Sequence, residues 1–354
     1  MAQSGELKIN KPEKVQPGYI LYSPYAGKGF VLIDREANIV HEWATGRYTK
    51  VAELLPSGRI LYARMRDGVF EADWANHVLW SYGCRQHHDF CRKPNGNTLI
   101  VCNEFVFIDR IWRGAMDKND RFIEVDRDGN IVWEYHLDQG IDDMFALLPK
   151  FKLPEAEDWA HNNTIESLPE TDLGRKDERF RPGNILFSGR SIHTIGVIDY
   201  ETKRIVWAFG EGELDGQHMP TMLPSGNILC FDNGTSRGFS RVIEIEPVRR
   251  EIVWEFRIPD YAHAKALSGQ ELLPNGNILI CCGNPGAVDS WGKRGGPSST
   301  SSGIIMEVTR DKEIVWELHN QIDGLRRAYL KAVYRAAFCP AERVEPHLRK
   351  NLLV

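Results

Sequence analysis

One short phrase, a glycine followed by a variable residue and then by Ile-Leu or a close variant, returns six times along the chain. It reads GYIL at residue 18, GRIL at 58, GNTL at 96 and GNIL at 183, 226 and 276. A second phrase, typified by IVWE, follows each of them and carries a tryptophan, after a strand-like stretch and a polar turn. Regular repetition of this kind indicates that one structural unit is used several times.

The spacing of the repeats indicates the kind of unit. Four of the five intervals between the glycines measure 38 to 50 residues, and each unit is rich in β-branched residues separated by turn residues. Four-stranded units of about this length are typical of a β-propeller. We therefore expect an all-β, six-bladed β-propeller over residues 18–320, after an N-terminal extension (1–17). The long interval from Gly96 to Gly183 contains an apparent insertion at 138–182.

The recurring tryptophans and the last residues complete the expected architecture. Periodic apolar positions are normally core positions, so we expect the tryptophans to pack between neighbouring blades. Residues 321–354 are expected to form a short C-terminal helical extension, with the helix in its first part. The apolar residues of this helix would then cover one end of the propeller. The tryptophans are Trp43, Trp133, Trp207, Trp254 and Trp316, and the apolar tail residues are Leu325, Leu330, Val333 and Phe338.

Composition excludes several classes of protein. The chain has 42% hydrophobic and 26% charged residues and a formal net charge of −5, so it lacks the positive field of a typical nucleic-acid-binding protein. No apolar run is long enough to span a membrane, and the first residues show no apolar leader. The seven cysteines form no Cys-x-x-Cys pair. We expect a cytoplasmic protein with reduced thiols, and the oligomeric state stays open.

Polar residues stand at matched places in the loops that enter the innermost strands. His88, Asn163 and His218 each lie six residues before a proline, and His161 lies two residues before Asn163. Equal offsets in a repeat imply equivalent places, so we expect these side chains to surround the propeller axis. Three histidines gathered in this way predict a functional site.

Other residues near these loops have weaker claims. Arg190 follows an apolar strand, and beside imidazoles its guanidinium would clamp the oxygens of a sulfate, phosphate or carboxylate. His193 lies in the same segment and is expected either to support the site or to pack. His87 should point away from His88 along a strand and serve the structure. His263 has no matching offset.

Four segments of the chain resemble the arylsulfate sulfotransferase family. They are HHDFCRKPNGNTL at 87–99, DWAHNNTI at 158–165, SGRSIHTIGVID at 188–199 and GQHMPTMLPSGNILCFDNG at 216–234, of which the last is the most specific. The resemblance extends over most of residues 18–320. It implies a six-bladed propeller that moves a sulfuryl group from an aryl sulfate to a phenol, without a nucleotide donor, through a sulfohistidine.

The resemblance also implies roles for individual residues. His218 matches the histidine that becomes sulfated, while His88, His161, Asn163 and Arg190 match residues that bind the sulfuryl oxygens. A neutral imidazole is a competent nucleophile, and the sulfuryl oxygens need several fixed donors. His161 or His88 would protonate the departing phenolate. The expected partners are a small aromatic sulfate donor and a phenolic acceptor, with no cofactor.

Three alternatives remain open on the residues alone. A lyase for a uronate-containing sugar would use Arg190 to neutralise the carboxylate and a histidine to remove the α-proton, with the 138–182 insertion as a wall. A metal-dependent enzyme would hold one divalent ion, such as zinc or manganese, with His88, His161 and His218. A non-catalytic interaction propeller is the third alternative.

Overall fold

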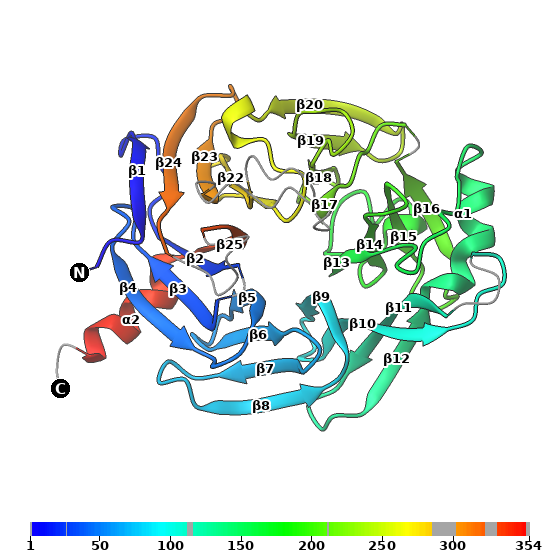
Figure 1. The fold of residues 1–354 in the computed structure, drawn as a ribbon, viewed down its shortest axis with the longest axis horizontal. Coiled ribbons are helices and arrows are strands. Elements are labelled where there is room, and N and C mark those ends of the chain that lie inside the picture. Colours follow the sequence, from blue (N-terminus) through cyan, green and yellow to red (C-terminus); the bar gives the residue numbers. More distant parts are fainter. Residues whose placement is uncertain are drawn as a thin grey trace.

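Six β-sheets surround one central axis in the computed structural model (Figure 1). The structure describes residues 2–25, 27–111, 116–210, 212–284, 302–322 and 331–351. Each sheet is antiparallel and is one blade, with its innermost strand at the axis and its fourth strand at the rim. The predicted six-bladed β-propeller with a short C-terminal helix is confirmed.

The blades are numbered in the order of their outer strands along the chain. From the axis outward, blade 1 consists of β25 (Val333–Cys339), β2 (Tyr19–Pro24), β3 (Gly29–Ile33) and β4 (Ile39–Ala44). Blade 2 consists of β5 (Thr49–Leu54), β6 (Ile60–Arg64), β7 (Gly68–Ala72) and β8 (Val78–Gly83). Blade 3 consists of β9 (Gln86–Arg92), β10 (Thr98–Val106), β11 (Asp117–Val125) and β12 (Ile131–His136). Blades 4 to 6 consist of β13 (Asn162–Ser167), β14 (Ile185–Gly189), β15 (Thr194–Ile198) and β16 (Ile205–Phe209); β17 (His218–Met222), β18 (Ile228–Asp232), β19 (Arg241–Glu246) and β20 (Glu251–Arg257); and β21 (Gly269–Leu272), β22 (Ile278–Cys282), β23 (Ile304–Val308) and β24 (Ile314–Asn320).

The repeated glycine closes the hairpin between the first and second strands of a blade. In blades 2 to 6 this glycine has a φ between 77° and 90°, the left-handed region that side chains other than glycine rarely enter. In blade 5, Leu223 donates its N–H to Asn227 O and Gly226 donates to Leu223 O, so the turn is pinned on both sides. The recurring sequence phrase therefore marks one backbone turn.

Both ends of the chain add strands to blades whose other strands lie far away in sequence. β25 pairs with β2 and supplies the innermost strand of blade 1, and β1 (Gly5–Asn10) pairs with β24 as a fifth strand of blade 6. The range 1–17, expected as an extension, thus contributes to the ring. The 138–182 range contains β13, the innermost strand of blade 4, as well as irregular segments.

The prediction of a helix at Val333 and Phe338 is wrong, because both residues belong to β25. The backbone groups of β2 need a partner on their axial side, and β25 satisfies them at the cost of the helix that the sequence suggested. The C-terminal helix is α2 (Ala341–Asn351) and begins directly after Pro340. Leu325 and Leu330 lie outside the described residues.

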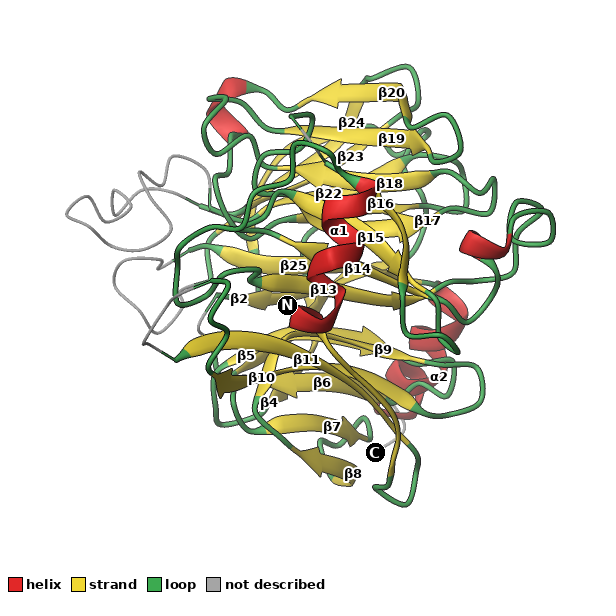
Figure 2. Cartoon of the chain, turned by 90° about the vertical axis from the view of Figure 1, so that its right-hand side faces the viewer, coloured by secondary structure: helices red, strands yellow, loops and turns green. Residues whose placement is uncertain are grey.

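Short helices lie on the outside of the ring. α1 (Ile141–Leu147) follows η1 (Leu137–Gly140) and packs Ile141 and Met144 into the same core cluster as Ile205 of β16 (Figure 2). η2 (Glu178–Phe180) and η3 (Asp260–Ala262) are single turns. No helix in the described part of the chain is long and apolar enough to cross a membrane.

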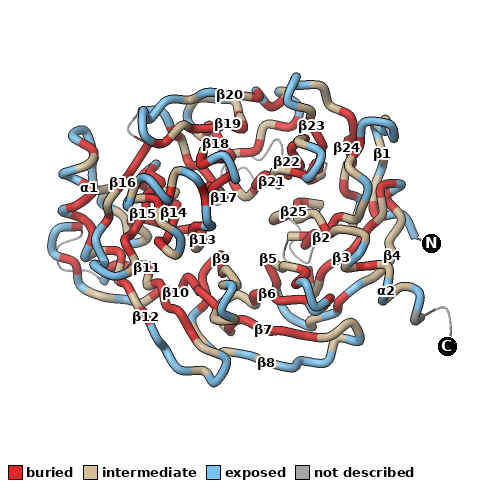
Figure 3. The backbone as a smooth tube through the Cα atoms, turned by 180° about the vertical axis from the view of Figure 1, so that it is seen from behind, coloured by how far each residue is buried: buried red, intermediate tan, exposed pale blue. Residues whose placement is uncertain are grey.

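Burial is greatest in the middle strands of each blade and least at the rim (Figure 3). The second and third strands of the blades are almost wholly buried, whereas β8, β12 and β20 leave Val78, Val132 and Val253 about half exposed. Each gap between adjacent blades is filled by apolar side chains from both, in separate core clusters. The apolar surface buried between blades is thus the main stabilising term.

A ring of tryptophan hydrogen bonds joins the blades at their rims. The fourth strand of each blade carries a tryptophan whose indole N–H donates to a backbone carbonyl in the turn between the third and fourth strands of the next blade. The six pairs are Trp43 to Asp73 (3.1 Å), Trp80 to Arg127 (3.0 Å), Trp133 to Tyr200 (2.7 Å), Trp207 to Pro247 (2.9 Å), Trp254 to Arg310 (2.9 Å) and Trp316 to Arg35 (2.8 Å). The last pair joins blade 6 to blade 1 and closes the ring. The predicted interblade role of the tryptophans is thereby explained.

Buried carboxyl groups join neighbouring innermost strands. Glu166 of β13 accepts the backbone N–H of Met222 in β17 (3.0 Å), and Glu271 of β21 accepts that of Phe338 in β25 (2.8 Å). Burial raises the pKa of Glu166 to about 8 and that of Glu271 to about 7. At neutral pH Glu166 is therefore mostly protonated and Glu271 is partly protonated, so burial reduces the charge of both carboxyl groups that link the blades.

We predict that Trp316→Phe lowers the free energy of unfolding by about 1–3 kcal/mol, because the Arg35 carbonyl loses a buried donor. Urea denaturation followed by circular dichroism measures this change. Trp254→Phe is the matched control, since it removes the same type of bond at an exposed position. An equal loss in both variants would contradict the importance of the closing pair.

Candidate active site

Six residues occupy one equivalent position at or just before the start of the innermost strands, each six residues before a proline. They are called the ring residues below and are Lys50, His88, Asn163, His218, Ser268 and Tyr334. Sequence reasoning found His88, Asn163 and His218. It missed Lys50, Ser268 and Tyr334, although Pro56, Pro274 and Pro340 give the same offset.

Each innermost strand is irregular close to its ring residue. The pairing register shifts between Thr49 and Ala52 in β5, between Asn162 and Thr164 in β13, and between His218 and Thr221 in β17. Residues at or next to the ring have positive φ angles, as at His88 (65°), His161 (49°), Met219 (51°) and Ser268 (87°). Such bulges release side chains from the strict alternation of a strand and redirect them at functional sites.

His218 presents an unprotonated nitrogen. Its Nδ1 lies 2.7 Å from Asn233 Oδ1 and 3.1 Å from Gly216 O, and both oxygens are acceptors, so Nδ1 carries the proton. The Asn233 amide is oriented by its own donation to Ala264 O (2.7 Å). Burial, and next the charge of Arg190, lower the pKa of His218 well below 6.5. Its Nε2 therefore keeps a free lone pair at neutral pH.

His88 has the opposite tautomer. Its Nδ1 lies 2.6 Å from the Tyr334 hydroxyl and 3.3 Å from Lys50 Nζ. An ammonium group only donates, so Nδ1 accepts and the ring proton resides on Nε2. Burial and then the charge of Lys50 lower the pKa of His88, which keeps the ring neutral. Nε2–H is buried and has no hydrogen-bond partner among the described residues, so it is free to donate to a ligand.

His161 forms a carboxylate–imidazole pair with Asp158. His161 Nδ1 lies 2.6 Å from Asp158 Oδ2, so Nδ1–H donates and Nε2 is left as an acceptor in the neutral ring. Burial lowers the pKa of His161, and Asp158 partly opposes this. Although burial alone would raise it, the hydrogen bond from His161 and its charge bring the pKa of Asp158 to about 2. Such a pair is suited to proton transfer at Nε2.

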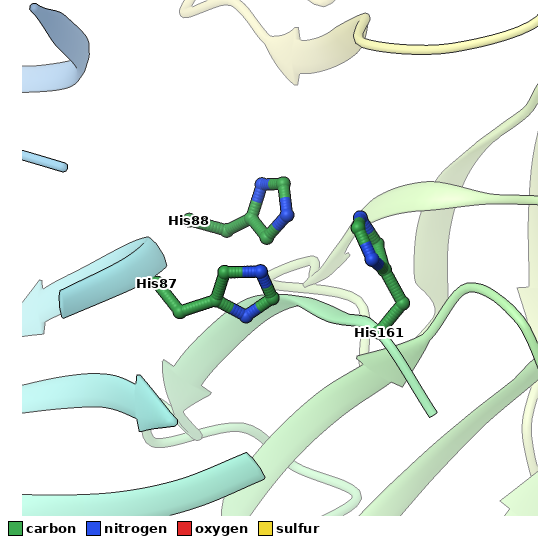
Figure 4. Close-up of side chains that lie close together, drawn as sticks. All are labelled: His87, His88 and His161. Carbon is green, nitrogen blue, oxygen red and sulfur yellow. The ribbon is translucent and has the colours of Figure 1, made fainter. Parts of the chain in front are cut away.

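His87 also belongs to the cluster, so the expectation that it points away from His88 is wrong. Its ring centroid lies 4.1 Å from that of His88 and 5.3 Å from that of His161 (Figure 4). The positive φ of His88 breaks the alternation on which the expectation depended. Asp120 Oδ1 holds His87 Nδ1 at 3.0 Å, and burial lowers the pKa of His87 well below 6.5.

Lys118, which sequence reasoning missed, joins the two histidine–carboxylate pairs. Its Nζ lies 2.8 Å from His87 Nε2 and 2.7 Å from Asp158 Oδ2. Lys118 stands in β11, outside the innermost strands, so no repeat offset pointed to it. Asp158 stood inside a segment that resembles the known family, and the motif was the available signal.

Arg190 directly follows β14 and supplies a partly buried positive charge. Its Nη2 donates to Lys265 O (3.3 Å), and burial lowers its pKa, although a guanidinium stays charged at neutral pH. The charge of Arg190 lowers the pKa of both His161 and His218, so the guanidinium lies near both rings.

Asn163 and His193 orient the segment that carries His218. Asn163 Nδ2 donates to Gln217 O (2.8 Å), and His193 Nδ1 accepts the N–H of Gly216 (2.9 Å). The His193 side chain is half exposed, and burial lowers its pKa. His193 therefore supports the loop before His218 from outside the cluster.

An ion pair crosses the axis one residue further along the innermost strands. Asp89 Oδ1 of β9 and Arg335 Nη1 of β25 lie 2.9 Å apart, and the second Asp89 oxygen accepts the N–H of Ile165 in β13 (3.2 Å). Blades 1, 3 and 4 are thereby tied together next to the ring residues. Neither residue was singled out by sequence reasoning.

Among the described residues, those that lie close enough for a shared metal ion are His87, His88 and His161. Their candidate ligand atoms are all within 4.8 Å of one another, and His218, expected as a third ligand, is not in this group. Lys118 donates to Nε2 of His87, and Lys50 leaves the proton on Nε2 of His88. The arrangement therefore does not offer three free lone pairs and does not fit a metal ion as it stands.

Fold and site together define a class of protein, a six-bladed β-propeller with neutral histidines and buried cations gathered at its axis. The model of the arylsulfotransferase (ASST) family matches residues 43–215. This confirms the resemblance to that family and covers His88, His161 and Arg190, while His218 lies just beyond the match. Over residues 43–215 the chain is similar to the arylsulfotransferases.

Solved structures with a similar fold share little sequence with this chain. A protein of unknown function from Bacteroides caccae has a TM-score of 0.58 at 13% identity, over 91% of this chain and 99% of that one. Hydrazine synthase from Kuenenia stuttgartiensis has a TM-score of 0.46 at 14% identity (78% and 66% covered), and the Dos1 propeller 0.43 at 10% (90% and 76%). The first likeness supports the fold alone. No curated protein matches the chain in sequence.

We predict that Asp158→Asn lowers the pKa of His161 by about one unit or more, because an opposite charge in direct contact is removed. Proton NMR titration of the histidine Cε1–H signals measures the shift, with His161→Gln identifying the resonance. Asp73→Asn, beside the exposed His77, is the control and should leave His161 unchanged. An unchanged or raised His161 pKa in Asp158→Asn would contradict the pairing.

Proposed function

We propose that this chain transfers a sulfuryl group from an aryl sulfate to a phenol, through a sulfohistidine at His218. The observation that carries the proposal is the tautomer of His218, whose Nδ1–H is held by Asn233 and Gly216 while Nε2 keeps its lone pair. Arg190 and the donating Nε2–H of His88 belong to the same buried cluster. The match to the arylsulfotransferase family supports the reaction class.

In the first step His218 Nε2 attacks the sulfur atom of the donor. The N–S bond forms as the bond from sulfur to the aryl oxygen breaks, and the electron pair departs on the phenolate oxygen. Arg190 and His88 Nε2–H stabilise the sulfuryl oxygens, where negative charge is concentrated. The side-chain oxygen of Asn233 accepts the hydrogen bond from His218 Nδ1–H. This bond stabilises the positive charge that develops on the imidazole ring.

In the second step a phenol accepts the sulfuryl group. His161 Nε2 takes the proton of the acceptor hydroxyl, while its Nδ1–H donates to Asp158. The acceptor oxygen attacks sulfur, and the S–N bond breaks with its electron pair returning to His218. The proton held by His161 passes to the next departing phenolate, so the cycle balances.

Aromatic rings beside the cluster suit a flat substrate. Tyr25 stacks on Tyr334 with centroids 6.4 Å apart and meets Tyr48 edge to face at 5.6 Å. Tyr334 in turn stacks on His88 (6.1 Å). An aryl sulfate would place its ring against these tyrosines while its sulfuryl group faces the histidines.

The uronate lyase receives no separate support from the geometry. Arg190 and His161 would fill its clamp and base roles, but the family match favours sulfuryl transfer. We therefore retain the lyase only as an arm of the assay below.

We predict that the purified protein turns over 4-nitrophenyl sulfate only when a phenol acceptor is present, and that without an acceptor it releases at most one nitrophenol per chain. His218→Ala should reduce the rate by at least about 10³-fold, because the nucleophile is removed, and Arg190→Ala by about 10²–10³-fold. His77→Ala, at an exposed histidine, is the matched control and should keep full activity. Mass spectrometry should find one sulfuryl group on wild type treated with donor alone, and none on His218→Ala.

Failure of wild type to turn over with a panel of phenols would overturn the proposed reaction. The same preparation is then offered a polymeric uronate, and new ultraviolet absorbance from an unsaturated product would establish the lyase. Activity retained by His218→Ala would exclude a sulfohistidine at this position.

The first step should tolerate acid. Only the neutral imidazole attacks, and burial and Arg190 lower the pKa of His218 well below 6.5. The burst rate of nitrophenol release should therefore stay constant as the pH falls through 6.5 and decline only at lower pH. Rapid-mixing measurement of the burst across this range checks the prediction. A half-maximal rate at or above pH 6.5 would contradict it.

A further inference from the structure

Three histidines near the axis have the arrangement of a metal centre. The rings of His87, His88 and His161 face a common space, with candidate ligand atoms within 4.8 Å of one another (Figure 4). His87 and His161 each hold a carboxylate at Nδ1, through Asp120 and Asp158. Histidine–carboxylate pairs of this kind orient imidazoles for a divalent ion. The groups that surround the three histidines decide whether the cluster binds a cation or an anion.

Lys118 occupies the lone pair that a metal would need on His87. Its Nζ lies 2.8 Å from His87 Nε2, and Asp158 Oδ2 holds the same ammonium at 2.7 Å. A metal ion at His87 would have to displace this N–H donor and would then lie beside an ammonium. The ammonium group of Lys118 thus occupies the position that a metal ion bound to His87 would need.

Lys50 sets the tautomer of His88 through its contact with Nδ1. Lys50 Nζ lies 3.3 Å from His88 Nδ1, and since it can only donate, the imidazole proton stays on Nε2. Nε2 is then a donor and offers no lone pair to a metal. The Lys50 residue is buried, with 4% exposed, so its charge is weakly screened.

The charged groups around the cluster are mostly positive. Lys50, Lys118 and Arg66 lower the pKa of His87, and Arg190 lowers that of His161. Asp120 and Asp158 hold Nδ1 of His87 and of His161. In contrast, Nε2 of His87 and Nδ1 of His88 each face an ammonium group, at 2.8 and 3.3 Å, and this positive charge favours an anionic ligand.

We propose that Lys50 and Lys118 determine the charge of the ligand, reserving the three-histidine cluster for an oxyanion and denying it to divalent metal ions. The two lysines are specificity-determining residues, because removing their charges converts the same imidazoles into a metal centre. The anion half of this inference rests on the proposed function. The metal half depends only on the contacts of the two lysines.

The test exchanges the two ligands on one set of variants. Cobalt(II) is titrated into wild type and into Lys50→Met/Lys118→Met, with visible absorption reporting coordination, and sulfate binding is measured by calorimetry. Wild type should bind sulfate and no stoichiometric cobalt. The double variant should bind one cobalt per chain and lose sulfate affinity by at least about tenfold. Lys152→Met, at an exposed lysine, is the matched control and should behave as wild type.

Adding His87→Ala to the double variant should abolish cobalt binding, which places the ion at the cluster. Circular dichroism confirms that each variant is folded, and Lys118→Met alone provides a second test should the double variant fail to fold. Stoichiometric cobalt on wild type, or none on a folded double variant, would overturn the inference. Absence of sulfate binding to wild type would remove the anion half and weaken the proposed function, while the cobalt result still decides the metal half.

Discussion

The shape of the molecule depends on the closed ring of tryptophan-to-carbonyl hydrogen bonds. Each blade holds the turn of the next, and the bond from Trp316 to Arg35 returns to the start. Because the six pairs are equivalent, the blades are set at similar relative positions around one axis. Equivalent residues of the innermost strands are then brought together, and this is why His88, Asn163 and His218 meet at the axis although they are far apart in sequence.

Each histidine of the site has its protonation pattern set by one neighbour. An amide oxygen holds the proton of His218 at Nδ1, an ammonium keeps that of His88 at Nε2, and a carboxylate holds that of His161 at Nδ1. The rings are chemically alike, yet His218 and His161 carry their proton on Nδ1, whereas His88 carries it on Nε2. Burial keeps all three neutral, so these differences persist at neutral pH.

The features that recur in every repeat could be predicted from the sequence. The glycine turns and tryptophans identified six blades, and the constant offset before proline found three of the six ring residues. It could not predict Lys118, because this residue reaches the cluster from β11, and tertiary packing alone brings it there. His87 was misplaced because a bulge breaks strand alternation. The sequence of β25 suggested a helix, because its strand conformation depends on pairing with β2 at the other end of the chain.

The position of β25 has a consequence for the synthesis of the protein. Tyr334 and Arg335 come from the last strand of the ring to be translated, and both contact residues of blade 3 at the axis. A nascent chain that lacks this strand has His218 and His161 already made but no finished enclosure around them. The surroundings of the histidines are therefore complete only after β25 has been translated and has paired with β2.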